Sequence, residues 1–111
     1  MAYDEDLANR IRALVQAEEG LTEQRMFGGL AFMINGNMAV GASGQSGLLL
    51  RVDPAQTDKL VAEPHASPFE MRGRPMKGWL RVDPDGLGTA RGLKKWVTRG
   101  VAYARSLPPK R

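Results

Sequence analysis

The chain has 111 residues, of which 42% are hydrophobic and 25% charged, with a formal net charge of +4 and no cysteine. This length and composition predict one ordinary globular domain over residues 1–111 and exclude disulfides, thiolate metal sites and a cysteine nucleophile. No apolar run approaches the roughly 18 residues of a membrane span. Acids (Asp4, Glu5, Asp6) stand where a signal peptide would carry bases. A cytoplasmic protein without membrane contact is therefore expected.

The charge is divided unevenly along the chain. Residues 1–69 hold nine acidic and five basic side chains, whereas residues 70–111 hold three acidic and eleven basic ones. Such asymmetry is found in chains that bind an anionic partner, nucleic acid first. It also arises where a basic face meets an acidic face of the same fold or of a second copy. The sequence leaves both explanations open, including a homodimer that joins such faces.

The N-terminal segment has the periodicity of an amphipathic helix. Apolar residues recur at helical spacing between Leu7 and Val15, acids precede them, and Gly20 supplies a stop signal. This pattern predicts a helix over about 4–18. A short strand is expected over 22–27.

A β-hairpin is the strongest local prediction. Asn35-Gly36 lies between two apolar runs, and these residues tolerate the positive φ angles of a two-residue type I′ turn. The preceding Gly28-Gly29 pair indicates a bend or a bulge. Leu30, Phe32 and Ile34 would then share one face. The turn predicts four facing pairs: Ile34 with Asn37, Met33 with Met38, Phe32 with Ala39, and Ala31 with Val40.

Residues 41–47 form a glycine-rich polar stretch that is expected to be a plain turn. A phosphate cradle is not favoured, because the stretch lacks the Lys and Ser/Thr of a P-loop and leads into a strand over 48–52 rather than into a helix. The segment Asp53-Pro54-Ala55-Gln56 follows, with Asp as N-cap and Gln completing a capping box. It predicts a short helix over about 54–62.

The single histidine, His65, does not indicate a catalytic or metal site. It lies in Pro64-His65-Ala66-Ser67-Pro68, which is expected to be an irregular crossing. A general base there would need an orienting carboxylate and a nucleophile that the sequence does not display, and one histidine without cysteine cannot build a usual zinc site. No catalytic residue, cofactor or metal is therefore expected.

The next segment predicts two strands, over 69–72 and 79–82, joined by a basic turn over 73–78. Pro75 cannot donate a ladder hydrogen bond, which assigns that part of the turn to a sheet edge or a loop.

A long helix is predicted over about 89–106, with Thr89 as its N-cap. Gly100 on its apolar side would allow a close approach to the sheet, and residues 107–111 form a basic tail. The apolar side is formed by Leu93, Trp96, Val97, Gly100, Ala104 and Leu107. The other side carries Arg91, Lys94, Lys95, Arg99 and Arg105 without an acid. Together these elements predict an α+β fold in which N-terminal, short middle and C-terminal helices pack on an antiparallel sheet built on the central hairpin.

The motif Arg25-Met26-Phe27-Gly28-Gly29, the apolar Asn-Gly hairpin and the downstream Gly78-Trp79 resemble the N-terminal domain of the TfoX/Sxy family. The resemblance extends from about residue 5 to 105. It implies a compact α+β unit and a role like that of the family's regulators of natural competence, which act with other transcription factors. It supplies no catalytic motif.

The chain departs from the family in ending at Arg111, and it is therefore expected to lack the second, C-terminal domain that such regulators usually carry. A regulatory activity that needs both domains therefore does not transfer directly. The residues that carry the resemblance are interpreted as scaffold positions, with a shared binding surface beside them as the alternative: Met26, Phe27, Gly28, Gly29, Gly78 and Trp79.

Three functions follow in order of preference. The first is a non-enzymatic regulatory or adaptor module that binds a protein partner, which predicts a surface apolar patch or an exposed sheet edge. The second is direct nucleic-acid binding, which predicts one continuous basic face. The third, an enzyme, is disfavoured because no matched acid, base and nucleophile are present. The candidate binding residues are Arg72, Arg74, Lys77, Arg91, Lys94, Lys95 and Arg99.

Overall fold

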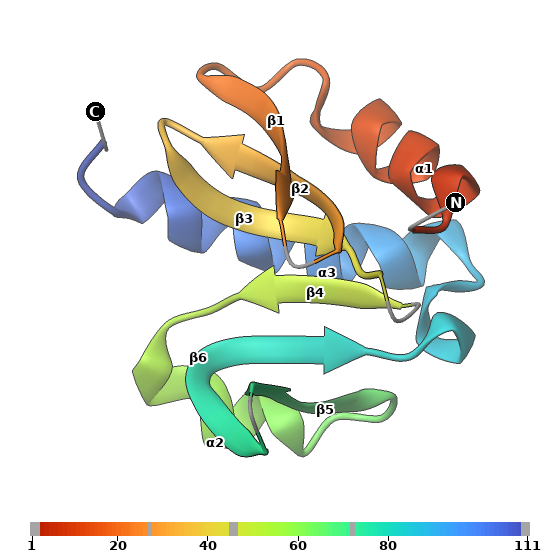
Figure 1. The fold of residues 1–111 in the computed structure, drawn as a ribbon, viewed down its shortest axis with the longest axis vertical. Coiled ribbons are helices and arrows are strands. Elements are labelled where there is room, and N and C mark those ends of the chain that lie inside the picture. Colours follow the sequence, from red (N-terminus) through yellow and green to blue (C-terminus); the bar gives the residue numbers. More distant parts are fainter. Residues whose placement is uncertain (1–2, 27, 45–46, 72, 110–111) are drawn as a thin grey trace.

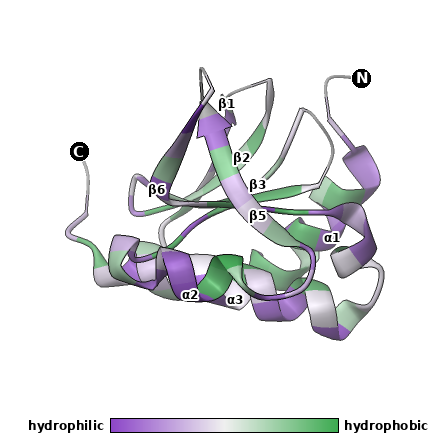
Figure 2. Ribbon diagram, turned by 90° about the horizontal axis from the view of Figure 1, so that it is seen from below, coloured by the Kyte–Doolittle hydropathy of each residue, from purple (hydrophilic) through white to green (hydrophobic). Residues whose placement is uncertain are grey.

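Six strands form one curved sheet, and three α-helices lie on one side of it (Figures 1 and 2). The computed structural model describes residues 3–26, 28–44, 47–71 and 73–109. The helices are α1 (Glu5–Val15), α2 (Thr57–Val61) and α3 (Ala90–Ser106), with short 3₁₀ helices at Pro54–Gln56 and Pro84–Leu87. The strands are β1 (Leu21–Met26), β2 (Gly29–Ile34), β3 (Asn37–Ala42), β4 (Leu48–Arg51), β5 (Ala66–Met71) and β6 (Arg74–Val82).

The strand order is β1-β2-β3-β4-β6-β5, and every neighbouring pair is antiparallel. The predicted α+β class is thereby confirmed. So is the central hairpin, since Asn35 and Gly36 have φ angles of 53° and 83°, which the type I′ turn requires. β1 and β5 are the two outer strands of the sheet.

The main core lies between the sheet and the helices. Side chains that alternate along the inner strands face α1 and α3, and α3 packs across the middle of the sheet behind β3 and β4 (Figure 1). Trp96 of α3 is 1% exposed, which agrees with its predicted place on the apolar side of this helix. The largest buried members of this core include Ile11, Phe32, Val40, Leu48, Leu50, Leu80, Val82, Leu93 and Trp96.

Two of the predicted helices begin where the sequence indicates. The Asp4 side chain accepts a hydrogen bond of 3.1 Å from the backbone N–H of Leu7, and the Thr89 hydroxyl accepts one of 3.0 Å from that of Gly92. The end of the first helix was predicted too late, because α1 stops at Val15 rather than at residue 18. The chain turns there toward Gly20, whose φ of 76° starts the approach to β1.

The predicted hairpin register is correct next to the turn and wrong beyond it. Ile34 faces Asn37 and Met33 faces Met38, but Phe32 faces Val40 rather than Ala39, because a bulge shifts the register. Ala39 and Val40 are both fully buried, Ala39 in a cluster with Ala104 of α3 and Val40 in the main core. The bulge therefore lets two consecutive residues of β3 pack on the helical side, which strict alternation forbids. Ala31 consequently faces Gly41, not Val40.

The predicted middle helix is divided. Residues 54–56 form a 3₁₀ turn, capped by Asp53, whose side chain accepts a hydrogen bond of 2.9 Å from the N–H of Ala55. The α-helix proper covers only Thr57–Val61, and Gln56 makes no capping hydrogen bond at its start. The predicted capping box was wrong, because the N–H of Gln56 bonds to the backbone oxygen of Asp53 and not to its side chain, although the Asp-Pro start was correct.

The last two strands are longer than predicted. β5 begins at Ala66, so residues 66–68 are a strand rather than an irregular crossing, and Pro68 is tolerated because β5 is an outer strand. β6 begins at Arg74, so most of the expected basic turn over 73–78 is also a strand. β4 pairs with β6 only from Trp79 onward, which leaves Pro75 at an edge where its missing N–H is harmless.

Candidate functional site: the concave face of the sheet

The side of the sheet that faces away from the helices carries a second apolar cluster. Ala31, Met38 and Leu49 lie at its centre and are at most 4% exposed. Half-buried larger side chains surround them, two from β1 and β2 and two from β5 and β6. We call this surface the concave face and define it by Met26, Ala31, Met33, Met38, Leu49, Phe69 and Trp79.

The curvature of the sheet gives this surface its shape. In Figure 2 the helices form a layer at the bottom, whereas β1 and the end of β5 both rise on the opposite side. The ends of the two outer strands therefore extend to the side of the sheet that faces away from the helices. Among the described residues, no helix covers this side, so the four larger side chains are the outermost apolar layer.

An arginine stands at the border of the concave face. The Arg51 guanidinium lies 5.7 Å from the centre of the Trp79 ring and 5.8 Å from that of Tyr103 on α3. Both distances are within the range of cation–π attraction. No carboxylate lies within ion-pair distance of Arg51 in the described part of the chain. The border thus presents a positive charge that two aromatic rings hold in place.

The residues that carry the family resemblance are of two kinds. Some are glycines that the backbone conformation or close packing requires, and others have side chains on the concave face. Gly28 and Gly78 have φ angles of 75° and 88°, and a side chain on Gly29 would collide with the carbonyl oxygen of Ala42. Met26 and Trp79, in contrast, both lie on the concave face. Phe27 lies outside the described residues.

Sequence reasoning missed Met33, Met38 and Phe69 as members of this surface, and it did not single out Arg51. A signal was present in β2, whose residues Gly29–Ile34 are all apolar instead of alternating with polar ones. Continuous apolar strands are buried or apolar on both faces. That pattern indicates a second apolar side of the sheet, but it cannot say which distant strand completes it.

The basic candidates lie in two separate places. Arg74 and Lys77 are exposed on β6, and Arg74 pairs with Met71 at the end of β5, which rises away from the helices in Figure 2. Arg91 and Lys94 are exposed on α3, in the helical layer. The two basic sets therefore come from different layers of the fold, the sheet and the helices. Arg72 lies outside the described residues.

Two further basic side chains of α3, Lys95 and Arg99, form ion pairs within the molecule. Lys95 and Arg99 lie 3.2 Å and 2.8 Å from the carboxylate oxygens of Glu63, and both stack on the Trp96 ring. Partial burial raises the pKa of Glu63, but the hydrogen bonds and charges of Arg99 and Lys95 lower it by more, so that its pKa lies below the ordinary value. Glu63 thus neutralises part of the basic side of the helix.

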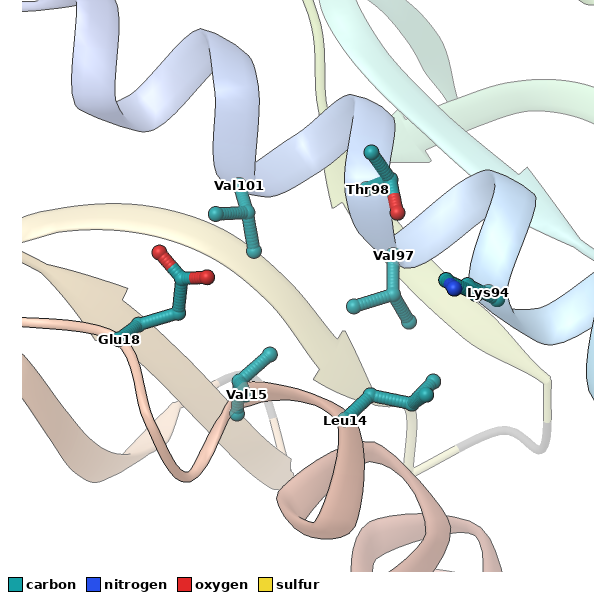
Figure 3. A pocket seen from close by; sticks show the side chains of 7 residues that line it. All are labelled: Leu14, Val15, Glu18, Lys94, Val97, Thr98 and Val101. Carbon is teal, nitrogen blue, oxygen red and sulfur yellow. The ribbon is translucent and has the colours of Figure 1, made fainter.

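A small pocket opens between α1 and α3 (Figure 3). Leu14, Val15, Val97 and Val101 form its apolar lining, and its volume is about 100 Å³. Glu18, Lys94 and Thr98 complete the lining. Sites for small molecules usually occupy about 300–1,000 Å³. The pocket is therefore too small to enclose a substrate.

The described residues contain no cluster of three or more His, Cys, Asp or Glu side chains that could hold a metal ion. His65 is exposed and has a φ of 69°, and its carbonyl oxygen accepts a hydrogen bond of 2.9 Å from the N–H of Asp83. Its visible role is to join α2 to β5. None of the helices in the described part of the chain is long and apolar enough to cross a membrane.

Comparison with known families gives one match. The model of the TfoX N-terminal domain matches residues 13–104, which is most of the chain. The searches among curated proteins and among solved structures gave no significant match. The match spans every strand and most of α3, and therefore includes the concave face.

Proposed function

Because this chain belongs to the TfoX N-terminal domain family, which is associated with the regulation of competence, we propose that it is a non-enzymatic regulatory module that binds a protein partner on its concave face. The observation that carries this proposal is the apolar layer of Met26, Met33, Phe69 and Trp79 on the side of the sheet that no described helix covers. Each of these four side chains is partly exposed, and apolar surface patches mark interaction surfaces in monomeric proteins.

The composition of the concave face favours a protein partner over a small molecule. Three of its members are methionines, whose flexible and polarisable side chains adapt to the shape of a partner. Trp79 supplies a large aromatic anchor of the type that dominates interface energies, and Arg51 adds a positive charge beside it. An apolar segment with acidic flanks matches this arrangement.

Direct nucleic-acid binding is the weaker candidate. It requires a continuous basic face, whereas Arg74 and Lys77 come from β6 in the sheet, and Arg91 and Lys94 come from α3 in the helical layer. Lys95 and Arg99 are in addition paired with Glu63. Random duplex DNA titrated at two salt concentrations is expected to show no salt-sensitive binding at micromolar protein; such binding would favour this candidate instead.

The proposal is tested by complementation in the host of the protein. Deletion of the gene is expected to change the levels of a defined set of transcripts, and the wild-type chain restores them. Met33→Glu places a charge on the concave face and is expected to fail, because burying an unpaired carboxylate against a partner is unfavourable. Transcript levels measured across the genome check this expectation.

The matched control is Leu14→Glu. Leu14 is an apolar side chain as well and, at 39%, is more exposed than the half-buried Met33, but it lies on α1 on the helical side. It is expected to restore the transcripts like the wild type, while circular dichroism shows that both variants are folded. Restoration by a folded Met33→Glu chain, or transcripts that do not respond to the deletion, would contradict the proposal.

A further inference from the structure

The outer edge of β1 is open along its whole length in the described structure. β1 pairs with β2 on one side, and no described strand pairs with the other side. Its residues Thr22, Glu23, Gln24 and Arg25 are all exposed. An unpaired strand edge is a template on which another strand adds by backbone hydrogen bonds.

The register of β1 on β2 shows which backbone groups point outward. The N–H of Asn35 donates a hydrogen bond of 3.0 Å to the carbonyl oxygen of Gly20, so Gly20 directs its backbone toward β2. Bonded and non-bonded pairs alternate in an antiparallel ladder, and the β1–β2 register has no shift. Thr22 and Gln24 therefore also direct their backbone toward β2, whereas Glu23 and Arg25 direct theirs toward the open edge.

The charges on this edge are complementary to themselves. Glu23 and Arg25 are two residues apart and lie on the same face of the strand. When a second copy of β1 is placed antiparallel with Gln24 opposite its own counterpart, each Glu23 faces an Arg25 of the other copy. The outward backbone groups of these two residues then also face each other. If the two copies were instead paired with Glu23 opposite Glu23, or with Arg25 opposite Arg25, like charges would face each other, which is unfavourable.

Arg25 is available for such a pair. No carboxylate lies within ion-pair distance of it among the described residues, whereas Glu23 already binds Arg12 of α1 at 2.7 Å and 2.8 Å. The Arg12 contact orients the Glu23 carboxylate and lowers its pKa, although some desolvation acts in the opposite direction. Glu23 thus stays charged at neutral pH, and on the other face two Gln24 amides can donate and accept a hydrogen bond between them.

We propose that two copies of this chain associate through their β1 edges, antiparallel and centred on Gln24, to form one continuous twelve-stranded sheet. This inference does not depend on the identity of the partner of the concave face. Sedimentation equilibrium from micromolar to millimolar protein is expected to show a monomer–dimer equilibrium. Hydrogen exchange is expected to slow at the amides of Glu23 and Arg25 when the dimer forms.

Charge reversal tests the register. Arg25→Glu places Glu opposite Glu23 at two positions of the dimer and is expected to weaken association roughly tenfold or more. Glu23→Lys weakens it likewise. A mixture of the two variants places opposite charges at both positions again, and is expected to associate more tightly than either variant alone. Arg91→Glu, an equal change of charge on α3, is expected to leave the equilibrium unaltered.

A blocking variant tests the edge itself. Arg25→Pro removes an N–H that points away from β2, so the β1–β2 ladder keeps its bonds while the open edge loses a donor. Circular dichroism is expected to remain unchanged and the dimer to disappear. A wild-type chain that stays monomeric at millimolar concentration, a folded Arg25→Glu variant that associates like the wild type, or a mixture no tighter than its components would each overturn the proposal.

Discussion

At the scale of single residues, one buried hydroxyl group holds the bend of β6. Thr57 is 5% exposed, and its Oγ1 accepts a hydrogen bond of 2.8 Å from the N–H of Gly78. The Gly78 carbonyl oxygen in turn accepts one of 2.8 Å from the N–H of Val52. Gly78 has a φ of 88°, so the position next to Trp79 combines a conformation that glycine tolerates best with a polar anchor from α2.

Replacing Thr57 by valine is expected to destabilise the protein by about 1–3 kcal/mol, because the N–H of Gly78 is then buried without a partner. Thr57→Ser keeps the hydroxyl and is expected to lose less than about 1 kcal/mol, the contribution of one methyl group. Urea unfolding of both variants measures the difference. Equal stability of Thr57→Val and the wild type would show that the hydrogen bond contributes nothing.

At the scale of elements, α3 and β3 approach each other at Gly100. A Cβ atom on Gly100 would lie 2.5 Å from the carbonyl oxygen of Ala39 and 2.6 Å from a methyl group of Val40. The neighbour is backbone, so it cannot rotate away. Both residues that crowd Gly100 stand at the bulge of β3, which brings them to the helical side of the sheet.

Gly100→Ala tests this contact against helix propensity. Propensity alone would stabilise the helix by about 1 kcal/mol. The overpacking against β3 is expected to outweigh it and to destabilise the protein by about 1–3 kcal/mol, measured by urea unfolding. Gly88→Ala is the matched control, since a Cβ there has only an ordinary contact at 3.9 Å, and it is expected to be neutral. An unchanged or stabilised Gly100→Ala variant would contradict the close approach.

The elements also show what local sequence can and cannot determine. The turn at Asn35-Gly36, the cap Thr89 and the apolar side of α3 follow from local rules, and each was predicted. The cap Asp4 also follows from such a rule, although this residue was predicted only as one of the acids at the helix start. The bulge at Ala39 arises from packing against a helix some sixty residues later in the chain, which no local pattern encodes. The predicted strands were shorter than β5 and β6, because Pro and Gly in these segments indicate turns. Pro is nevertheless tolerated there because it lies at an edge of the sheet, which only the strand order reveals.

The concave face was beyond prediction for the same reason. The family-like motif pointed to Met26 and Trp79 as scaffold residues, yet their common surface exists only because β1 and β6 curve toward the same side. The basic candidates were recognisable as charges. Their partner Glu63, which lies 32 and 36 residues before Lys95 and Arg99, could not be deduced from sequence.

At the scale of the whole molecule, the uneven charge of the chain is partly balanced by contacts between its two halves. Glu63 binds Lys95 and Arg99, and Glu18 binds Arg105 at 2.7 Å. In each case an acid from the first 69 residues meets a base of α3. The basic side of this helix therefore meets acids of the same fold, which is one of the two explanations that the sequence left open.

These contacts predict how stability depends on pH. The pKa of Glu63 is lowered in the folded state, so its stabilising contribution is complete above its ordinary pKa of 4.5 and is lost as the pH falls through the lower, folded-state pKa. Glu63→Gln is expected to cost about 0.5–1 kcal/mol at neutral pH, and the difference from the wild type is expected to vanish in acid. Urea unfolding at several pH values measures this convergence.

The control for this experiment is Glu70→Gln, an exposed carboxylate without an ion pair among the described residues. It is expected to leave stability unaltered at neutral pH. A constant difference between Glu63→Gln and the wild type at every pH would show that the substitution acts through packing rather than through charge.

The position of α3 after all six strands has a consequence for how the protein is made. The sheet is complete at Val82, but the apolar side chains that cover its inner face, among them Leu93, Trp96 and Val97, are synthesised after it. A nascent chain that has only its strands therefore exposes a wide apolar surface to the cytosol of any cell that translates it. Folding of the sheet during translation must wait for α3, and chains without this helix are the form most exposed to aggregation and to chaperones.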